Sequence, residues 1–166
     1  AASKERPMFT TALIAGDSVI LDAIHKAGLI NKVPIVFVDT YTLFPESMAH
    51  LREVEKHYGF EAKVYAAQGC TDQADYISKY GNDYWMKDID AYDMLCKVEP
   101  MNRALKEQDS DCWINGRRRD HGAERAALPV SITLLLFQYI LLHFLIHYGN
   151  MSNPILLSFV TVIPLC

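Results

Sequence analysis

The chain contains four short apolar runs with the length and composition of buried β-strands. Their apolar residues are either continuous or alternate with polar ones, as in strands that are covered on one or both faces. Polar or glycine-containing segments that are typical of turns come directly after the runs. We therefore expect strands at residues 9–15, 34–38, 61–66 and 112–115.

Between these runs, apolar residues recur at the three- and four-residue spacing of amphipathic helices. Pro45 and Pro100 fall where a helix would begin, a position that favours proline, and Thr71 or Asp72 can cap the helix after it. The expected helices cover residues 19–27, 45–58, 73–80 and 99–108. This alternation predicts an α/β fold, with a mostly parallel sheet of about four or five strands and helices on both faces.

Charge divides the chain into two parts. No Asp, Glu, Lys or Arg occurs after Pro129, so all fixed charges lie in residues 1–129. We expect residues 1–129 to form a globular domain and residues 130–166 to form an uncharged apolar tail. Residues 130–148 have the length of one membrane-spanning helix, roughly 17–25 residues. The sequence leaves three interpretations of the tail open: a membrane anchor, a buried helical hairpin, or an end that departs from the ancestral reading frame.

Composition limits the classes of function. The formal net charge of −4 at pH 7 argues against general nucleic-acid binding. The four cysteines include no CxxC pair, which argues against a zinc site, and their low density argues against a disulfide framework. The N-terminal residues lack the apolar core of a secretory signal. A cytoplasmic location is the simplest expectation, and a membrane anchor in the tail would still leave the globular part in the cytosol.

Two strand ends carry residues suited to an anionic ligand. Gly16, Asp17 and Ser18 form a predicted turn before a helix, where backbone N–H groups and the helix dipole attract anions. The Asp17 carboxylate would repel a phosphate there unless it points away. Asp39 and Thr40 come directly after a predicted strand, at the edge where open α/β sheets bind ligands. An aspartate in this position can equally cap a turn.

Basic residues gather after the last predicted strand. A guanidinium group fits phosphate or sulfate oxygens two at a time, so a cluster of arginines suits a polyanionic ligand, although such a cluster can also be a solvated loop. Lys97 and Arg103, on or beside the preceding helix, could reach the same ligand or stay in solvent. The clustered arginines are Arg117, Arg118, Arg119 and Arg125.

The same region carries the longest motif of the chain. Residues 97–107 read KVEPMNRALKE, and a W-x-x-G-x-R-R motif and a further arginine come after them. This stretch resembles the 3′-phosphoadenylyl sulfate (PAPS) reductase family, in its cluster-free fungal and bacterial form. The resemblance covers about residues 8–129, including a D-T-x-x-x-F-P-E pattern from Asp39 to Glu46. The residues of the W-x-x-G-x-R-R motif and the arginine after it are Trp113, Gly116, Arg118, Arg119 and Arg125.

The resemblance implies a fold of the adenine-nucleotide alpha-hydrolase type and a ligand that is PAPS or adenosine 3′,5′-bisphosphate. It implies reduction of PAPS to sulfite in assimilatory sulfate reduction, with thioredoxin or glutaredoxin as the electron donor, and it allows a homodimer. Our candidate substrate-binding residues are Gly16, Asp17, Ser18, Asp39, Thr40, Lys97, Arg103, Arg118, Arg119 and Arg125.

The cysteines qualify this expectation. Cluster-containing relatives carry a double cysteine where this chain has Cys96 before Lys97, so we expect no iron–sulfur cluster and no bound cofactor. The family's nucleophilic cysteine lies in a C-terminal E-C-G-I/L-H motif, which this chain lacks. Cys166 is a weak candidate because it has neither the acidic nor the histidine neighbour. The alternative is therefore a catalytically inactive nucleotide-binding remnant, tethered to a membrane if the tail inserts.

Overall fold

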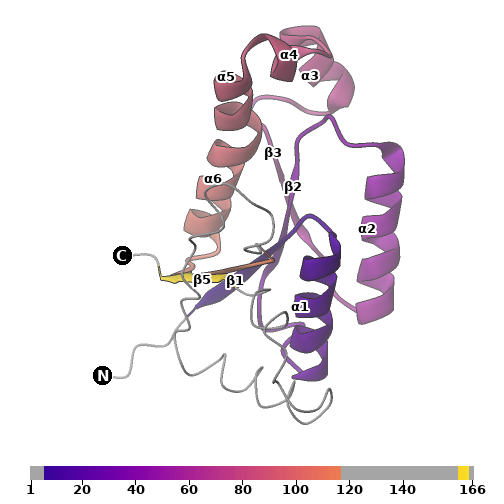
Figure 1. The fold of residues 1–166 in the computed structure, drawn as a ribbon, viewed down its shortest axis with the longest axis vertical. Helices are drawn as coiled ribbons and strands as arrows, with labels where there is room; N and C mark the ends of the chain where they lie inside the picture. Colours follow the sequence, from indigo (N-terminus) through magenta and orange to yellow (C-terminus); the bar gives the residue numbers. More distant parts are fainter. Residues whose placement is uncertain (1–5, 117–160, 165–166) are drawn as a thin grey trace.

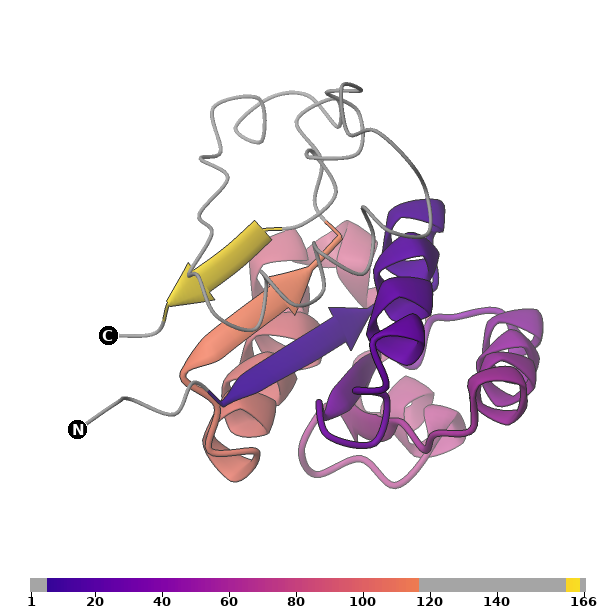
Figure 2. The same ribbon diagram turned by 90° about the horizontal axis from the view of Figure 1, so that it is seen from below.

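The structure, a computed structural model, describes residues 6–116 and the backbone of residues 161–164. These residues form one sheet in the order β3-β2-β1-β4-β5. Neighbouring strands from β3 to β4 run parallel, whereas β5 pairs antiparallel with β4 (Figures 1 and 2). The strands are β1 (Pro7–Thr11), β2 (Ile35–Asp39), β3 (Lys63–Ala66), β4 (Cys112–Asn115) and β5 (Thr161–Pro164).

Helices cover both faces of the sheet. Helix α1 (Ala15–Lys26) and helix α2 (Pro45–Tyr58) lie on one side, and α6 (Glu99–Glu107) lies on the other (Figure 1). Phe9 of β1 packs with α1, whereas the preceding Met8 packs with α6. Such alternation explains why the strands read as continuous apolar runs: each face of the sheet has its own core. The mostly parallel α/β fold expected from the sequence is confirmed.

The end of β1 differs from the sequence prediction. The strand stops at Thr11 and α1 begins at Ala15, so Gly16, Asp17 and Ser18 belong to the first helical turn rather than to a turn before the helix. The Ser18 amide donates to the Ile14 carbonyl oxygen at 3.0 Å, which closes this first turn. Strands β2, β3 and β4 match their predicted positions to within about two residues, the usual scatter of element ends.

Sequence periodicity missed the helical segment before α6. Helices α4 (Tyr84–Lys87) and α5 (Ile89–Asp93) lead into a π-helical turn, η1 (Met94–Val98), which continues directly into α6. Pro100 therefore lies just after a widened turn and does not start a separate helix. Proline has no N–H for a helical hydrogen bond, and a π-helical turn is one way for a helix to accommodate an irregularity of this kind.

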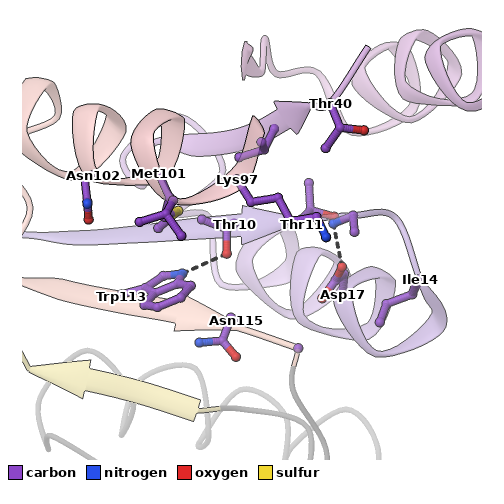
Figure 3. A pocket seen from close by; sticks show the side chains of 14 residues that line it. Thr10, Thr11, Ile14, Asp17, Thr40, Lys97, Met101, Asn102, Trp113 and Asn115 are labelled. Carbon is purple, nitrogen blue, oxygen red and sulfur yellow. Dashed lines mark hydrogen bonds between the residues drawn. The ribbon is translucent and has the colours of Figure 1, made fainter. Parts of the chain in front are cut away.

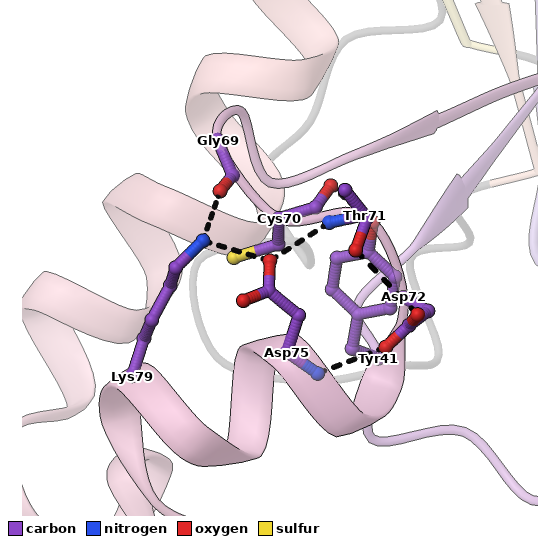
Figure 4. A network of polar contacts seen from close by, with 7 residues as sticks. All are labelled: Tyr41, Gly69, Cys70, Thr71, Asp72, Asp75 and Lys79. Carbon is purple, nitrogen blue, oxygen red and sulfur yellow. Dashed lines mark hydrogen bonds and ion pairs between the residues drawn. The ribbon is translucent and has the colours of Figure 1, made fainter.

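The capping of α3 (Gln73–Tyr80) agrees with the prediction. Asp72 accepts a hydrogen bond from the Asp75 amide at 2.8 Å, and Asp75 accepts one from the Thr71 amide at 3.0 Å (Figure 4). Lys79 reaches back to Asp75 at 2.7 Å and also donates to the Gly69 carbonyl oxygen. These contacts join α3 to the loop after β3.

Replacing Asp72 with alanine should lower the free energy of unfolding by about 1 kcal/mol, the usual worth of a side-chain N-cap. The Asp75 amide would lose its acceptor. Asp72→Asn should retain most of the stability, because asparagine also caps helices well. Urea unfolding of both variants checks the expectation, and equal losses in the two would show that the cap is not what stabilises this end of α3.

No helix within residues 6–116 is both long and apolar enough to cross a membrane. Residues 130–148, the predicted candidate for such a span, lie outside the described part of the chain. Residues 161–164, which the sequence assigned to the apolar tail, form β5 beside β4.

Candidate functional site

A cavity of about 540 Å³ opens at the carboxyl ends of β1, β2 and β4. The parallel register places Thr10 of β1 opposite Asn115 of β4, and Thr40 comes after the last residue of β2. Residues from η1 and α6 close the other side (Figure 3). The lining residues are Thr10, Thr11, Ala12, Ile14, Asp17, Val38, Thr40, Lys97, Val98, Met101, Asn102, Trp113, Asn115 and Gly116.

Asp17 is tied into the loop between β1 and α1. The residue is 4% exposed, and its Oδ2 accepts a hydrogen bond from the Ala12 amide at 2.7 Å (Figure 3). It also accepts from the Ile14 and Gly116 amides and from the Thr11 hydroxyl. Burial raises the pKa of this carboxyl group, and the hydrogen bonds partly oppose that rise. The N–H groups expected to bind an anion are thus partly taken by the chain's own carboxylate.

The turn after β2 is capped in the same way as the turn after β1. Asp39 Oδ1 accepts a hydrogen bond from the Tyr41 amide at 2.8 Å, as Thr11 Oγ1 does from Leu13 at 2.9 Å. Both Leu13 and Tyr41 adopt positive φ angles, 59° and 58°. Asp39 therefore caps a turn and does not line the cavity, the alternative that the sequence left open. Its neighbour Thr40 does line the cavity.

Lys97 is the cationic residue among the described residues that line the cavity. The π-helical turn carries it, and its Nζ pairs with Asp93 Oδ1 at 2.6 Å and lies 5.1 Å from the centre of the Tyr92 ring. About half of its side chain is exposed. A lysine held at the rim by one carboxylate can turn toward an anionic ligand at modest cost, because exposed ion pairs are weak.

Arg103 lies outside the cavity. Its guanidinium donates to Glu99 at 2.8 Å and to the Ala66 carbonyl oxygen at 2.6 Å, and it lies over the Tyr65 ring. The hydrogen bond from Arg103 lowers the pKa of the Glu99 carboxyl group, which also accepts a hydrogen bond from the Gln68 amide. Arg103 therefore fastens α6 to the end of β3.

Sequence reasoning missed the hydroxyl and amide groups of the cavity. Thr10, Thr11 and Asn115 all lie at carboxyl ends of buried parallel strands, where the topology predicts a ligand edge. A polar residue at such a position was the signal that could have revealed them. Trp113, the tryptophan of the W-x-x-G-x-R-R motif, packs partly against the α6 side but also lines the cavity, and its Nε1 donates to Thr10 Oγ1 at 2.8 Å.

The structure thus brings part of the predicted site together. Asp17, Thr40 and Lys97 line the cavity. Arg118, Arg119, Arg125 and Cys166 lie outside the described residues. The predicted residues that are described but do not line the cavity are Gly16, Ser18, Asp39 and Arg103.

Thiols and metal ligands are not gathered at the cavity in the described part of the chain. Cys70, Cys96 and Cys112 are the cysteines of residues 6–116, and none of the three lines the cavity. Burial raises the pKa of the Cys96 thiol, which disfavours the reactive thiolate. Among the described residues, no group of three or more His, Cys, Asp or Glu side chains could hold a metal ion.

The fold and the cavity define an open α/β domain with a candidate ligand site at the carboxyl edge of its sheet. A family model, the phosphoadenosine phosphosulfate reductase domain, matches residues 6–144. The chain therefore belongs to this family, as its sequence motifs predicted.

Individual relatives agree with this assignment. The chain is 38% identical over 127 residues to phosphoadenosine phosphosulfate reductase of Saccharomyces cerevisiae, a match that covers 73% of this chain and 48% of the yeast protein. The reductase of Cronobacter sakazakii is 37% identical over 100 residues, or 59% of this chain and 40% of that protein. The chain spans about half the length of the curated relatives it matches, or less.

A solved structure shares the fold. The crystal structure of phosphoadenylyl-sulfate reductase from Candida auris, a phosphate complex, superposes with a TM-score of 0.66 at 27% sequence identity. The match covers 89% of this chain and 75% of the Candida chain.

Proposed function

We propose that this chain forms the substrate-binding part of a reductase that converts PAPS to sulfite and adenosine 3′,5′-bisphosphate in assimilatory sulfate reduction. The observation that carries the proposal is the cavity at the carboxyl edge of the sheet, in a chain of this family. The cavity joins hydroxyl groups from two strand ends to the ammonium group of Lys97. Hydroxyl and ammonium groups suit phosphate and sulfate oxygens, which are strong hydrogen-bond acceptors.

Different residues have different tasks in this proposal. Thr10, Thr40 and Lys97 contact the nucleotide, and Asp17 holds the loop between β1 and α1, whose residues Ala12 and Ile14 line the cavity. Arg103 acts through α6 and makes no ligand contact. The remaining ligand contacts come from the arginines that the sequence singled out, Arg118, Arg119 and Arg125.

The reaction needs a thiolate and a dithiol. A cysteine thiolate attacks the sulfo sulfur of PAPS, an S–S bond forms, and the bond between that sulfur and the bridging phosphate oxygen breaks to release adenosine 3′,5′-bisphosphate. Thioredoxin or glutaredoxin then reduces the resulting cysteine thiosulfonate, with release of sulfite. The chain would work in the cytoplasm, without an iron–sulfur cluster or other bound cofactor, as a monomer or a homodimer.

A second candidate function is nucleotide binding without reduction. It is favoured by the position of the thiols, because none of the three cysteines in the described part of the chain lines the cavity. In that case residues 1–129 would be a binding domain, and the tail at residues 130–166 would serve another purpose, such as membrane attachment.

Label transfer separates the two functions. The purified chain is incubated with sulfur-labelled PAPS in the absence of reductant, and protein-bound label is then measured. Label that thioredoxin removes as sulfite supports the reductase, and peptide mapping shows whether Cys166 carries it. Binding of adenosine 3′,5′-bisphosphate without label supports the binding domain. The absence of both label and binding would contradict both candidates.

Lys97→Ala should weaken binding of adenosine 3′,5′-bisphosphate by about tenfold, because a charge-assisted contact to a phosphate is lost. The matched control is Lys87→Ala. Lys87 also pairs with the carboxylate four residues before it, Asp83, at 2.6 Å, but lies outside the cavity. Calorimetric titration of both variants checks this, and equal losses of affinity would remove Lys97 from the site.

A further inference from the structure

One hydrogen bond in the cavity has a fixed direction. The indole Nε1 of Trp113 lies 2.8 Å from Thr10 Oγ1 (Figure 3). An indole nitrogen carries a hydrogen and cannot accept a hydrogen bond, so the threonine oxygen must be the acceptor. The hydroxyl group of Thr10 therefore has its own hydrogen left to donate.

The strands place this pair at the cavity wall. Thr10 lies two residues after Met8, on the face of β1 that packs against α6, and Trp113 lies in the β4 register position opposite Met8. The indole therefore reaches diagonally across to the threonine. Both side chains line the cavity, and Met101 of α6 lies on its other side (Figure 3).

Residues 6–116 leave the hydrogen of the Thr10 hydroxyl available to a ligand. Within the described part of the chain, the Thr10 hydroxyl accepts the bond from Trp113 and donates none to another residue. Thr10 is half-buried, and a donor at a partly desolvated wall gains most from an acceptor that the ligand supplies. The next residue, Thr11, differs because it is buried and serves the loop through Leu13 and Asp17.

We propose that Thr10 donates a hydrogen bond to an anionic oxygen of the bound nucleotide, and that Trp113 is the positioning residue that fixes this direction. The inference rests on the proposed function and adds a residue pair that binds the ligand. A phosphate or sulfate oxygen has no hydrogen to donate at neutral pH and can accept the hydrogen of Thr10. The pair therefore suits an anionic oxygen at this wall.

The test uses conservative variants of the whole chain and calorimetric titration with adenosine 3′,5′-bisphosphate. Thr10→Val keeps the shape of the side chain but removes the hydroxyl, and we expect about tenfold weaker binding. Thr10→Ser retains the hydroxyl and should bind close to the unmodified chain. Trp113→Phe keeps an aromatic ring but removes the N–H, and we expect about threefold weaker binding because the hydroxyl is no longer held in one orientation.

A double-mutant cycle separates positioning from packing. Trp113→Phe should weaken binding in the presence of Thr10 but should have little effect in the Thr10→Val background, because the hydroxyl it orients is already absent. A purely structural tryptophan would cost the same affinity in both backgrounds, and that result would overturn its positioning role. Should Trp113→Phe fail to fold, the Thr10→Val and Thr10→Ser pair still tests the donor.

The outcomes of the titrations also distinguish this inference from the proposed function on which it rests. Unchanged affinity in Thr10→Val, with normal binding by the unmodified chain, would overturn the inference alone. No binding by the unmodified chain would overturn the proposed function as well.

The hydrogen bond from Trp113 to Thr10 can be monitored by NMR in the absence of ligand. The chain has two tryptophans, and Trp85 lies on α4 outside the cavity with 48% of its surface exposed. In a Trp85→Phe background, the remaining indole N–H resonance reports on Trp113. Thr10→Val should shift this resonance and Thr10→Ser should restore it. An indole resonance that is insensitive to Thr10→Val would contradict the contact.

Discussion

Gly116→Ala is expected to destabilise the chain by about 3 kcal/mol and to abolish measurable ligand binding, because the added methyl group has no room. A Cβ atom built on Gly116 would overlap the Asp17 carboxylate and would lie 2.9 Å from the Asp17 amide nitrogen. The amide of Gly116 also donates to that carboxylate. The substitution would therefore push α1 away from the end of β4 and would weaken a hydrogen bond within the cavity wall.

Gly28→Ala is the matched control for Gly116→Ala. Gly28 has a φ of +69° and no atoms within 4 Å of a Cβ built on it. Its substitution should cost about 1 kcal/mol through backbone conformation alone. It should leave ligand binding intact, since Gly28 lies outside the cavity. Urea unfolding and nucleotide titration measure the two effects. If both variants lost the same stability, close packing at Gly116 would not be the cause.

The origin of the Gly116 effect can be tested directly. In an Asp17→Ala background the carboxylate that the new methyl group would meet is gone, so the additional cost of Gly116→Ala should be smaller. Purely additive losses would mean that the two residues act on stability independently, contrary to their contact.

The fold was predictable from the sequence because its core is built from local patterns. Continuous apolar runs marked β2 and β4, and helical periodicity with proline at the first turn gave the bounds of α2 without error. The segment from α4 to η1 was missed because it carries exposed apolar side chains such as Trp85, Met86 and Met94, which obscure the periodicity. Its π-helical turn also departs from the 3.6-residue repeat.

The candidate site was less predictable because its residues are defined by partners distant in sequence. Asp17 has the position of a ligand contact, yet its acceptor atoms are taken by amides on both sides of it, including that of Gly116 just after β4. Arg103 is basic and close to the motif, yet it binds the end of β3. Thr10 belongs to a buried strand, and only the register between β1 and β4 shows that Trp113 reaches it. The position of the motif thus identified the region of the candidate site. The role of each residue became clear only from its contacts with residues on other strands and helices.

Asp17→Ala should lower the free energy of unfolding by about 2 kcal/mol at neutral pH, because several donors lose their acceptor at once. The amides of Ala12, Ile14 and Gly116 and the hydroxyl of Thr11 all converge on this carboxylate. The matched control is Asp22→Ala on the same helix. Asp22 pairs with Lys26 at 2.8 Å with four-residue spacing, and such pairs contribute only about 0.3–0.5 kcal/mol.

The pH dependence of this loss depends on the protonation of Asp17. Burial raises the pKa of its carboxyl group above the ordinary value of 3.8, so the folded chain binds the proton more tightly than the unfolded chain. The resulting contribution to stability is complete below pH 3.8 and is lost as the pH rises through the raised pKa. Asp17→Ala lacks this titration, so the stability difference between the two chains should narrow as the pH rises from 3.8 through the raised pKa of Asp17.

Urea unfolding of the unmodified chain and of Asp17→Ala at several pH values measures this difference. If the stability difference between the two chains widened with rising pH, the converging hydrogen bonds would outweigh burial and hold the pKa of Asp17 below its ordinary value. Asp17 would then act as a permanently charged group that anchors the β1–α1 loop, and a nearby phosphate would be repelled by it. A stability difference that narrows would show that burial outweighs the hydrogen bonds and raises the pKa of Asp17, so that the carboxyl group takes up a proton, and repels a phosphate less, as the pH falls through that raised pKa.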